Sequence, residues 1–269
     1  MRYAEFSPSK RLEDIVECYW TMEGGGTGFA VEAEHVSVDP GIELFFNLGA
    51  GYDRRDIDCH ETARVNGSHI VGIRTKPIVV TQAGRAHTFA VRFRPEGLAR
   101  LLRFPLAEIT HTVIDAKEIL GSECSAVEER LYDAVDDAAR VAVVEAALVR
   151  LDARRPTTTV ERDAELVAAV RRGVASLDSL CTERDISYRA LERSFARSVG
   201  IPPKLFAQIL RWRRASQLLL GGERDPWVDE YYDQSHFIRD FRRFTGRSPG
   251  DFLARGEQIS RWLLSGGEG

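Results

Sequence analysis

The chain has 269 residues, of which 43% are hydrophobic and 29% are charged. This length exceeds what one hydrophobic core usually supports, and this composition excludes a disordered chain, so two soluble globular domains are expected. The net charge of −4 is uneven: residues 1–155 hold 19 basic against 25 acidic side chains, whereas residues 156–258 hold 17 against 15.

No hydrophobic run is long enough to cross a membrane, and the first 25 residues lack the pattern of a signal peptide. The four cysteines are widely separated and form no Cys/His pattern for zinc. We therefore expect a cytoplasmic protein that has no metal site, no cofactor and no contact with a membrane.

The first part of the chain is predicted to form short β-strands. Five segments are rich in β-branched and aromatic residues, as strands are: 36–38, 42–48, 69–73, 78–81 and 88–93. Asp-Pro-Gly at 39–41 and Gly-Ala-Gly at 49–51 are typical turn sequences. The pattern predicts a small antiparallel barrel or sandwich.

A helix is predicted to follow this β-rich part. From Ser125 to Arg154, apolar residues recur at helical spacing, so we expect one long helix, with Ala139 as the place for a break. Residues 154–159 contain a proline and three threonines, which end the periodicity. We place a domain boundary there, between residues 1–155 and residues 156–258, with a tail at 259–269.

Residues 175–200 fit a helix-turn-helix unit, in which two short helices meet at a tight turn at 184–186. Ser187 is a good N-cap for the second helix. Apolar residues recur on one face of the two helices: Leu177, Leu180, Cys181, Leu191, Phe195 and Val199. This spacing directs five side chains outward: Tyr188, Arg189, Glu192, Arg193 and Arg197.

Basic charge accumulates in the same region. Between Ser187 and Arg214 the chain has seven basic residues and one acidic residue, Glu192. Such a strip can meet phosphate groups even on an acidic protein, and arginine can form paired hydrogen bonds with guanine. The periodicity alone fits a solvated helical bundle with an arginine-rich face equally well.

Two motifs in this part of the chain resemble the AraC family of bacterial regulators. They are Ser-Tyr-Arg-Ala-Leu-Glu-Arg-Ser-Phe at 187–195, followed by Val-Gly-Ile-Pro-Pro-Lys at 199–204, and the segment 232–249, which ends in Phe-x-x-x-x-Gly-x-Ser-Pro. The resemblance covers Val170 to Arg255. It implies two helix-turn-helix units, joined by a helix at Lys204–Leu220, whose recognition helices enter successive major grooves.

The resemblance implies a second recognition helix that is capped at Asp233 and runs to Thr245, with its phenylalanines facing inward. Six of its side chains would then face DNA: Gln234, Ser235, Ile238, Arg239, Arg242 and Arg243. Arg243 is assigned to the DNA backbone, as is Arg247. Only residues 221–230 remain for the helix that members of the family place before it, which allows at most one turn. We expect the phenylalanines of the second unit to be poorly covered.

The β-rich part resembles the N-terminal domain of a branch of AraC-like regulators. The motifs lie at Leu12–Trp20, Pro40–Gly49 and Val91–Gly97. The resemblance spans about residues 3–110 and implies a cupin-like domain that senses a ligand, whose identity is not assigned, or dimerises. The predicted fold class is therefore α+β: an antiparallel β-barrel with helices, then an all-α double helix-turn-helix domain.

A small-molecule pocket in this domain is one interpretation of its aromatic and polar residues, and an ordinary aromatic core is the other. The candidate lining residues are Trp20, Glu43, Asn47, Arg74 and Arg92, together with Phe45. Arg92 and Arg94 on one strand can pair with an anionic ligand or simply with Glu43. The histidines at 35, 60, 69 and 87 stand singly, which argues against a metal site.

Together these features predict a DNA-binding transcription regulator that is not an enzyme. Its expected partners are double-stranded DNA, a small-molecule effector, a second copy of the chain, and RNA polymerase if it activates transcription. Two alternatives remain. One is a regulator-derived binding module whose impaired second unit leaves only non-specific DNA affinity; the other is a barrel enzyme, for which no convergent catalytic groups are found.

Overall fold

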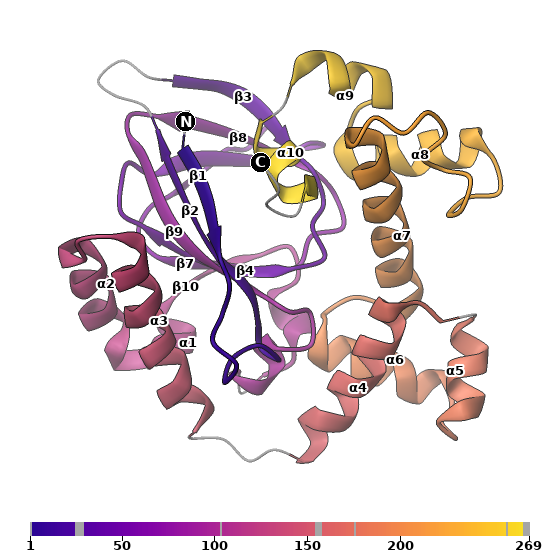
Figure 1. The fold of residues 1–269 in the computed structure, drawn as a ribbon, viewed down its shortest axis with the longest axis horizontal. Coiled ribbons are helices and arrows are strands. Elements are labelled where there is room, and N and C mark those ends of the chain that lie inside the picture. The colour runs from indigo at the N-terminus through magenta and orange to yellow at the C-terminus, as the bar shows by residue number, and fades with distance from the viewer. Residues whose placement is uncertain are drawn as a thin grey trace.

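The computed structural model describes residues 2–24, 30–102, 104–153, 158–174, 176–256 and 258–265. Most of the predicted domain boundary and the last four residues of the predicted tail lie outside the described residues. In the first half of the chain, strands form two antiparallel sheets that face each other (Figure 1). In the second half, the described residues form helices and the turns between them.

The first sheet has the strand order β1-β2-β9-β4-β7-β10 and the second has the order β3-β8-β5-β6. The strands span β1 Arg2–Phe6, β2 Val16–Gly24, β3 Ala30–Val36, β4 Ile42–Asn47, β5 Tyr52–Asp56, β6 Ala63–Val65, β7 His69–Val71, β8 Ile78–Ala83, β9 Ala86–Phe93 and β10 Val113–Asp115. The predicted fold class is confirmed. Within the described residues, strands pair only inside their own sheet, so the sheets form a sandwich-like pair and not the closed barrel of the prediction.

Successive side chains along the central strands point to opposite sides of the first sheet, so its two faces differ. Leu44 and Phe46 of β4 are fully buried in the main core together with the following helices. Glu43 and Phe45 point to the opposite face, toward the second sheet. The register Glu43↔Arg92 and Leu44↔Val91 continues the same division onto β9. One face therefore builds the core, and the other is left to form a pocket.

The predicted strand segments locate β4, β7, β8 and β9, while the first of them reaches only the last residue of β3. Strand β5 was not predicted. Its sequence, Tyr-Asp-Arg-Arg-Asp, lacks the apolar alternation that indicates a strand, and it is held between β8 and β6 by backbone pairing.

Helices follow the sheets. Three short 3-10 turns, η1 Leu98–Arg100, η2 Leu106–Ile109 and η3 Gly121–Glu123, accompany α1 Lys117–Leu120, α2 Cys124–Asp133 and α3 Asp137–Asp152. The predicted long helix is thus two helices, and the break lies just before Ala139. Asp136 ends the interruption, because its carboxylate accepts a hydrogen bond from the backbone N–H of Ala139 over 2.8 Å and caps α3.

The second half contains seven helices within the described residues: α4 Thr158–Arg172, α5 Leu177–Glu183, α6 Tyr188–Ser198, α7 Pro203–Leu220, α8 Gln234–Thr245, α9 Pro249–Arg255 and α10 Gln258–Ser265. α7 is the predicted linking helix. In Figure 1 it runs between α5 and α6 at one end and α8 and α9 at the other. None of the helices described combines the length and the hydrophobicity that a membrane span requires.

The two halves are in contact at several points. The hydroxyl of Thr110, after η2, donates to the carbonyl oxygen of Gly200 over 2.9 Å. Arg171 of α4 bonds to Glu96 over 2.8 Å. At the other end of α7, α10 lies against β3. Both ends of the helical half therefore contact the first half of the chain.

Candidate nucleic-acid interface and internal pocket

The first helix-turn-helix consists of α5 and α6. Ser187 caps α6 as predicted, with its hydroxyl accepting a hydrogen bond from the N–H of Ala190 over 3.2 Å. Asp185 in the turn has a φ of 48°, a left-handed conformation that aspartate tolerates better than most residues. Leu191 and Phe195 are fully buried. α6 thus begins at a capped residue, and its first two residues, Tyr188 and Arg189, are exposed.

All five predicted side chains on α6 are exposed, and four of them form no hydrogen bond or ion pair within the part of the chain that the structure describes: Tyr188, Arg189, Glu192 and Arg193. Neither Arg189 nor Arg193 forms a hydrogen bond or an ion pair with any residue that the structure describes. Because a guanidinium group presents several N–H donors, these two side chains keep their full capacity to bind phosphate or base edges.

Arg197 differs from the other four. It is exposed, but its Nε and Nη2 atoms donate to the carboxylate of Asp163 on α4 over 2.8 and 2.9 Å. The Asp163 side chain is only 5% exposed. This bidentate pair ties α6 to α4, so Arg197 already has a structural partner in the fold.

The second recognition helix is α8, which begins and ends where the sequence predicts. Asp233 caps it, accepting from the N–H of His236 over 2.7 Å, and Gly246 ends it in a left-handed conformation. Gln234, Ser235, Arg239, Arg242 and Arg243 are exposed, and Ile238 is half-buried. Arg243 lies over the ring of Phe244 at 5.1 Å and donates to Gln208 over 3.5 Å. Arg239 and Arg242 have no such partner among the described residues.

The expectation that the second unit is poorly covered is wrong. No helix lies between α7 and α8, as the short segment predicts, yet Phe237, Phe241 and Phe244 are at most 1% exposed. A turn that contains Trp227 and Tyr231 replaces the missing helix: their rings lie 6.0 and 5.5 Å from the ring of Phe237. Aromatic side chains bury enough surface each to substitute for a helix face.

The other side of this aromatic core comes from the neighbouring helices. The ring centroid of Trp212 on α7 lies 5.4 Å from that of Phe244, and the ring centroid of Phe252 on α9 lies 5.4 Å from that of Phe241. An ion pair between Arg214 and Glu230 anchors the turn to α7. The buried face of α8 is therefore covered by aromatic packing instead of a preceding helix.

The spacing of the two units is set by α7. An α-helix of 18 residues is about 27 Å long, which is of the order of the ~34 Å between successive major grooves on one face of DNA. α6 and α8 thus lie at opposite ends of α7 (Figure 1).

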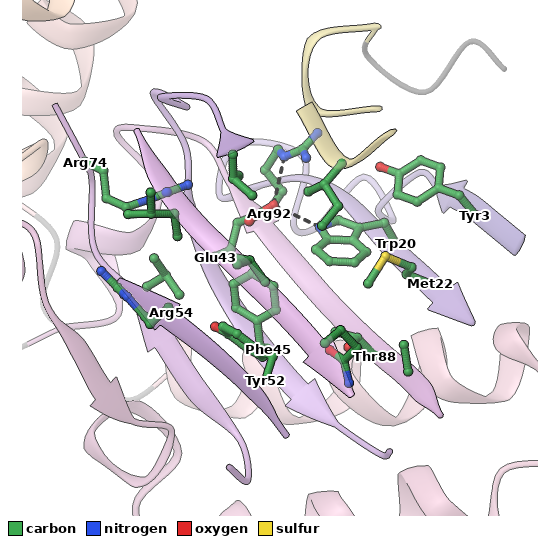
Figure 2. A pocket seen from close by; sticks show the side chains of 17 residues that line it. Tyr3, Trp20, Met22, Glu43, Phe45, Tyr52, Arg54, Arg74, Thr88 and Arg92 are labelled. Atoms are coloured by element: carbon green, nitrogen blue, oxygen red, sulfur yellow. Dashed lines mark hydrogen bonds and ion pairs between the residues drawn. The ribbon is translucent and has the colours of Figure 1, made fainter. Parts of the chain in front are cut away.

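A second site lies between the two β-sheets. Its cavity volume is ≈ 110 Å³, and its walls come from both sheets and from Ile259 of α10. Figure 2 shows Tyr3, Trp20 and Met22 at one end, Arg54 and Arg74 at the other, and Phe45 and Tyr52 along the wall between them. Four of the five predicted lining residues come together here: Trp20, Glu43, Arg74 and Arg92.

Asn47 does not line the cavity. It is the last residue of β4, and its side chain accepts from the N–H of Gly49 over 3.4 Å. Arg94 also points elsewhere, toward the carbonyl oxygen of Glu13. Sequence reasoning missed Arg54, Tyr52 and Tyr3, because their strands, β5 and β1, lack an apolar pattern.

Glu43 is the polar centre of the pocket. One of its oxygens accepts from Trp20 Nε1 over 2.9 Å and from Arg92 Nε over 3.1 Å. Arg92 also lies 3.6 Å from Glu5. Burial raises the pKa of Glu43, with the positive charge of Arg92 opposing it. Arg92 is therefore paired with Glu43, one of the two roles that the sequence left open.

Metal binding finds no support in the described residues, where no three His, Cys, Asp or Glu side chains are placed to hold an ion. His69, for example, stacks on Phe45 at 4.9 Å and shares a hydrogen bond with the hydroxyl of Tyr52 over 2.9 Å.

Two family models match parts of the chain. Residues 4–115 match a domain of unknown function (DUF6597), and residues 180–255 match a helix-turn-helix domain of the AraC type. The second match contains both recognition helices and the spacer between them. The chain contains a helix-turn-helix domain of the AraC type. No protein among the curated proteins matches it.

Solved structures similar to this chain include ToxT from Vibrio cholerae O395, with 11% identity, a TM-score of 0.49 and coverage of 88% of this chain and 97% of that one. Unsaturated fatty acid bound ToxT from Vibrio cholerae strain SCE256 has 9% identity, a TM-score of 0.46 and coverage of 87% and 93%. The AraC-like transcriptional activator CuxR has 14% identity, a TM-score of 0.33 and coverage of 82% and 83%. The AraC-type helix-turn-helix domain identifies the chain as a DNA-binding transcription regulator.

Proposed function

We propose that this regulator reads a specific two-part DNA site through α6 and α8, and that a small molecule in the β-sheet pocket controls this binding. The first half rests on two capped helices, each of which carries two exposed arginines without a hydrogen-bond or ion-pair partner among the described residues: Arg189 and Arg193 on α6, and Arg239 and Arg242 on α8. The division into a sensing part, residues 1–155, and a DNA-binding part, residues 156–258, belongs to the same proposal.

On α6, Arg189, Glu192 and Arg193 read bases. The arginines suit guanine edges and Glu192 suits the amino group of cytosine. On α8, Gln234, Ser235 and Arg239 have the equivalent positions near the capped end. Arg242 and Arg243, which lie further along α8, bind the DNA backbone, together with Tyr188 at the start of α6.

The second half of the proposal rests on α10, which connects the pocket to the DNA-binding part. Ile259 lines the pocket, and the hydroxyl of Ser260 accepts from the N–H of Ser37 over 2.9 Å and donates to the carbonyl oxygen of His35 over 2.7 Å. α10 also packs against α7, the spacer between the two units. A ligand that displaces Ile259 therefore changes how the spacer is held.

Selection of binding sites from random duplex DNA by the intact protein tests the first half. We expect a site of two parts about one helical turn apart, with affinity that falls as salt rises. Enrichment of a single short half-site would confine base reading to α6. No enrichment, with salt-sensitive binding of all sequences, would contradict specific recognition and favour a binding module with non-specific DNA affinity.

A further inference from the structure

The pocket has two buried arginines, Arg54 and Arg74, whose Nη1 atoms have no hydrogen-bond partner among the described residues. We propose that it binds a small apolar monocarboxylate, whose carboxylate is held by Arg54 and Arg74 and whose body packs against the aromatic end. The claim that this ligand is the effector rests on the proposed function. The claim that it binds in the pocket does not.

Arg74 provides the main evidence for a bound anion. Its side chain is 8% exposed, and its Nη1 atom is buried without a hydrogen-bond partner. No carboxylate lies within ion-pair distance of it among the described residues. A buried charge without a partner costs several kcal/mol in an ordinary core, so such a group is retained where a ligand completes it. Burial lowers the pKa of Arg74, and the charge of Arg54 lowers it further.

Arg54 repeats the pattern from β5. It is also 8% exposed, and its Nη1 atom is buried and unpartnered. Its one ion-pair contact is with Asp56 at 3.8 Å, through the other terminal nitrogen, and the side chain of Asp56 is 60% exposed. Two guanidinium groups that repel each other are thus brought to one end of the pocket (Figure 2).

The carboxylates near this end are already engaged. Glu43 accepts from Trp20 and Arg92, and Asp39 accepts from the backbone N–H of Gly41 over 2.6 Å. Both act on Arg74 electrostatically, but from beyond ion-pair distance. Arg92 also has an unpartnered Nη2 atom, yet its charge is met by Glu43 and Glu5. The unmet positive charge belongs to Arg54 and Arg74.

The rest of the pocket selects the body of the ligand. Its walls are mostly apolar and aromatic, with Trp20 and Phe45 in contact at a ring separation of 5.5 Å. A volume of ≈ 110 Å³ is of the order of cavities that take up one benzene-sized molecule. A guanidinium fork matches the two oxygens of a carboxylate. One ring or short branched chain with a single carboxylate fits both ends.

Benzoate is a suitable probe, with benzamide as its neutral counterpart and inorganic phosphate as an anion without an apolar body. Binding to the full chain is measured by titration calorimetry and by the shift in melting temperature. We expect benzoate to bind at least tenfold more tightly than either comparator, because hydrogen bonds to charged groups are worth about a tenfold to hundredfold change in affinity. Equal binding of benzamide, tighter binding of phosphate, or no benzoate binding would overturn the proposal.

The variants Arg74→Gln and Arg54→Gln test the residues. Each should weaken benzoate at least tenfold, and Arg74→Gln should leave the ligand-free melting temperature unchanged or higher, since it removes an unpaired buried charge. Arg55→Gln is the matched control: Arg55 is next along β5, points to the other face and donates to Cys59. Arg74→Lys keeps the charge and should retain part of the affinity. If Arg74→Gln unfolds the protein, Arg74 has a structural partner and the proposal fails.

The proposal of specific DNA recognition and the proposal of carboxylate binding can be disproved independently. Benzoate that binds through Arg74, in a protein that selects no DNA site, would leave the carboxylate pocket standing and remove specific DNA recognition. A selected DNA site in a protein that does not distinguish benzoate from benzamide would leave DNA recognition standing and overturn the ligand class.

Discussion

The backbone N–H of Val38 donates a hydrogen bond to the carbonyl oxygen of Phe244 over 2.9 Å. This bond joins the loop after β3 to the last turn of α8. At the other unit, Thr110 makes the equivalent contact with the carbonyl oxygen of Gly200. Each helix-turn-helix unit thus contacts the first half of the chain near the C-terminal end of α6 or α8, and neither of these two hydrogen bonds involves the N-terminal end of the helix.

The contact at Gly200 can be tested by adding one methyl group. In Gly200→Ala the new Cβ would lie 2.5 Å from Thr110 Oγ1 and 2.9 Å from the carbonyl oxygen of Leu106. Gly222→Ala is the matched control, because both glycines have a positive φ but Gly222 has open space around it. We expect Gly222→Ala to cost about 1 kcal/mol of unfolding free energy and Gly200→Ala roughly 1–3 kcal/mol more, measured by urea unfolding. Equal costs would mean that the contact does not contribute.

Arg193→Ala should weaken binding to the selected DNA site by roughly 1–3 kcal/mol and relax the preference at one base position. Affinities for the site and for variants at each position measure this. Arg162→Ala on α4, which removes an exposed arginine outside the recognition helices, is the control. A uniform loss on every sequence would make Arg193 a phosphate contact.

Arg197→Ala should reduce stability and leave base preference unchanged. Removal of the guanidinium leaves the carboxylate of Asp163 buried with one weak partner, Ser198 Oγ at 3.4 Å, which costs about 1–3 kcal/mol. Adding Asp163→Asn should recover part of this loss in a double-mutant cycle. A relaxed base preference with unchanged unfolding free energy would instead assign Arg197 to DNA.

Trp227→Ala should destabilise the second unit by about 2–4 kcal/mol, because its ring covers Phe237 in place of a helix. We expect the selected site to shrink to the half that α6 reads, while binding of that half remains. Val228→Ala, at an exposed neighbouring side chain, should have little effect. An intact two-part site in the Trp227 variant would show that the turn is not needed to hold α8.

Ser260→Ala should loosen α10 from β3, since it leaves the N–H of Ser37 and the carbonyl oxygen of His35 without their shared partner. The cost is about 1–3 kcal/mol of unfolding free energy. Exposed Ser122 provides the control variant, Ser122→Ala. If α10 couples the pocket to α7, the variant should also lose the effect of ligand on DNA affinity; a preserved effect would remove α10 from the coupling.

The sequence by itself determined the features that depend on neighbours along the chain. Ser187 and Asp233 cap their helices because each hydroxyl or carboxylate reaches an N–H three residues ahead. The inward faces of α6 and α8 follow from the helical period of their apolar residues. These rules operate over a few residues, so the two recognition helices and their exposed arginines could be predicted.

Only the tertiary structure decided what depends on segments far apart. It brought Arg54 of β5 beside Arg74, paired Arg197 with Asp163, and placed Trp227 over Phe237 where the missing helix implied an uncovered face. The local sequence around a side chain does not show whether it will line a pocket, form an ion pair or pack in a core. Which of these roles it takes depends on the partners that long-range packing supplies, and these leave no periodic pattern in the chain.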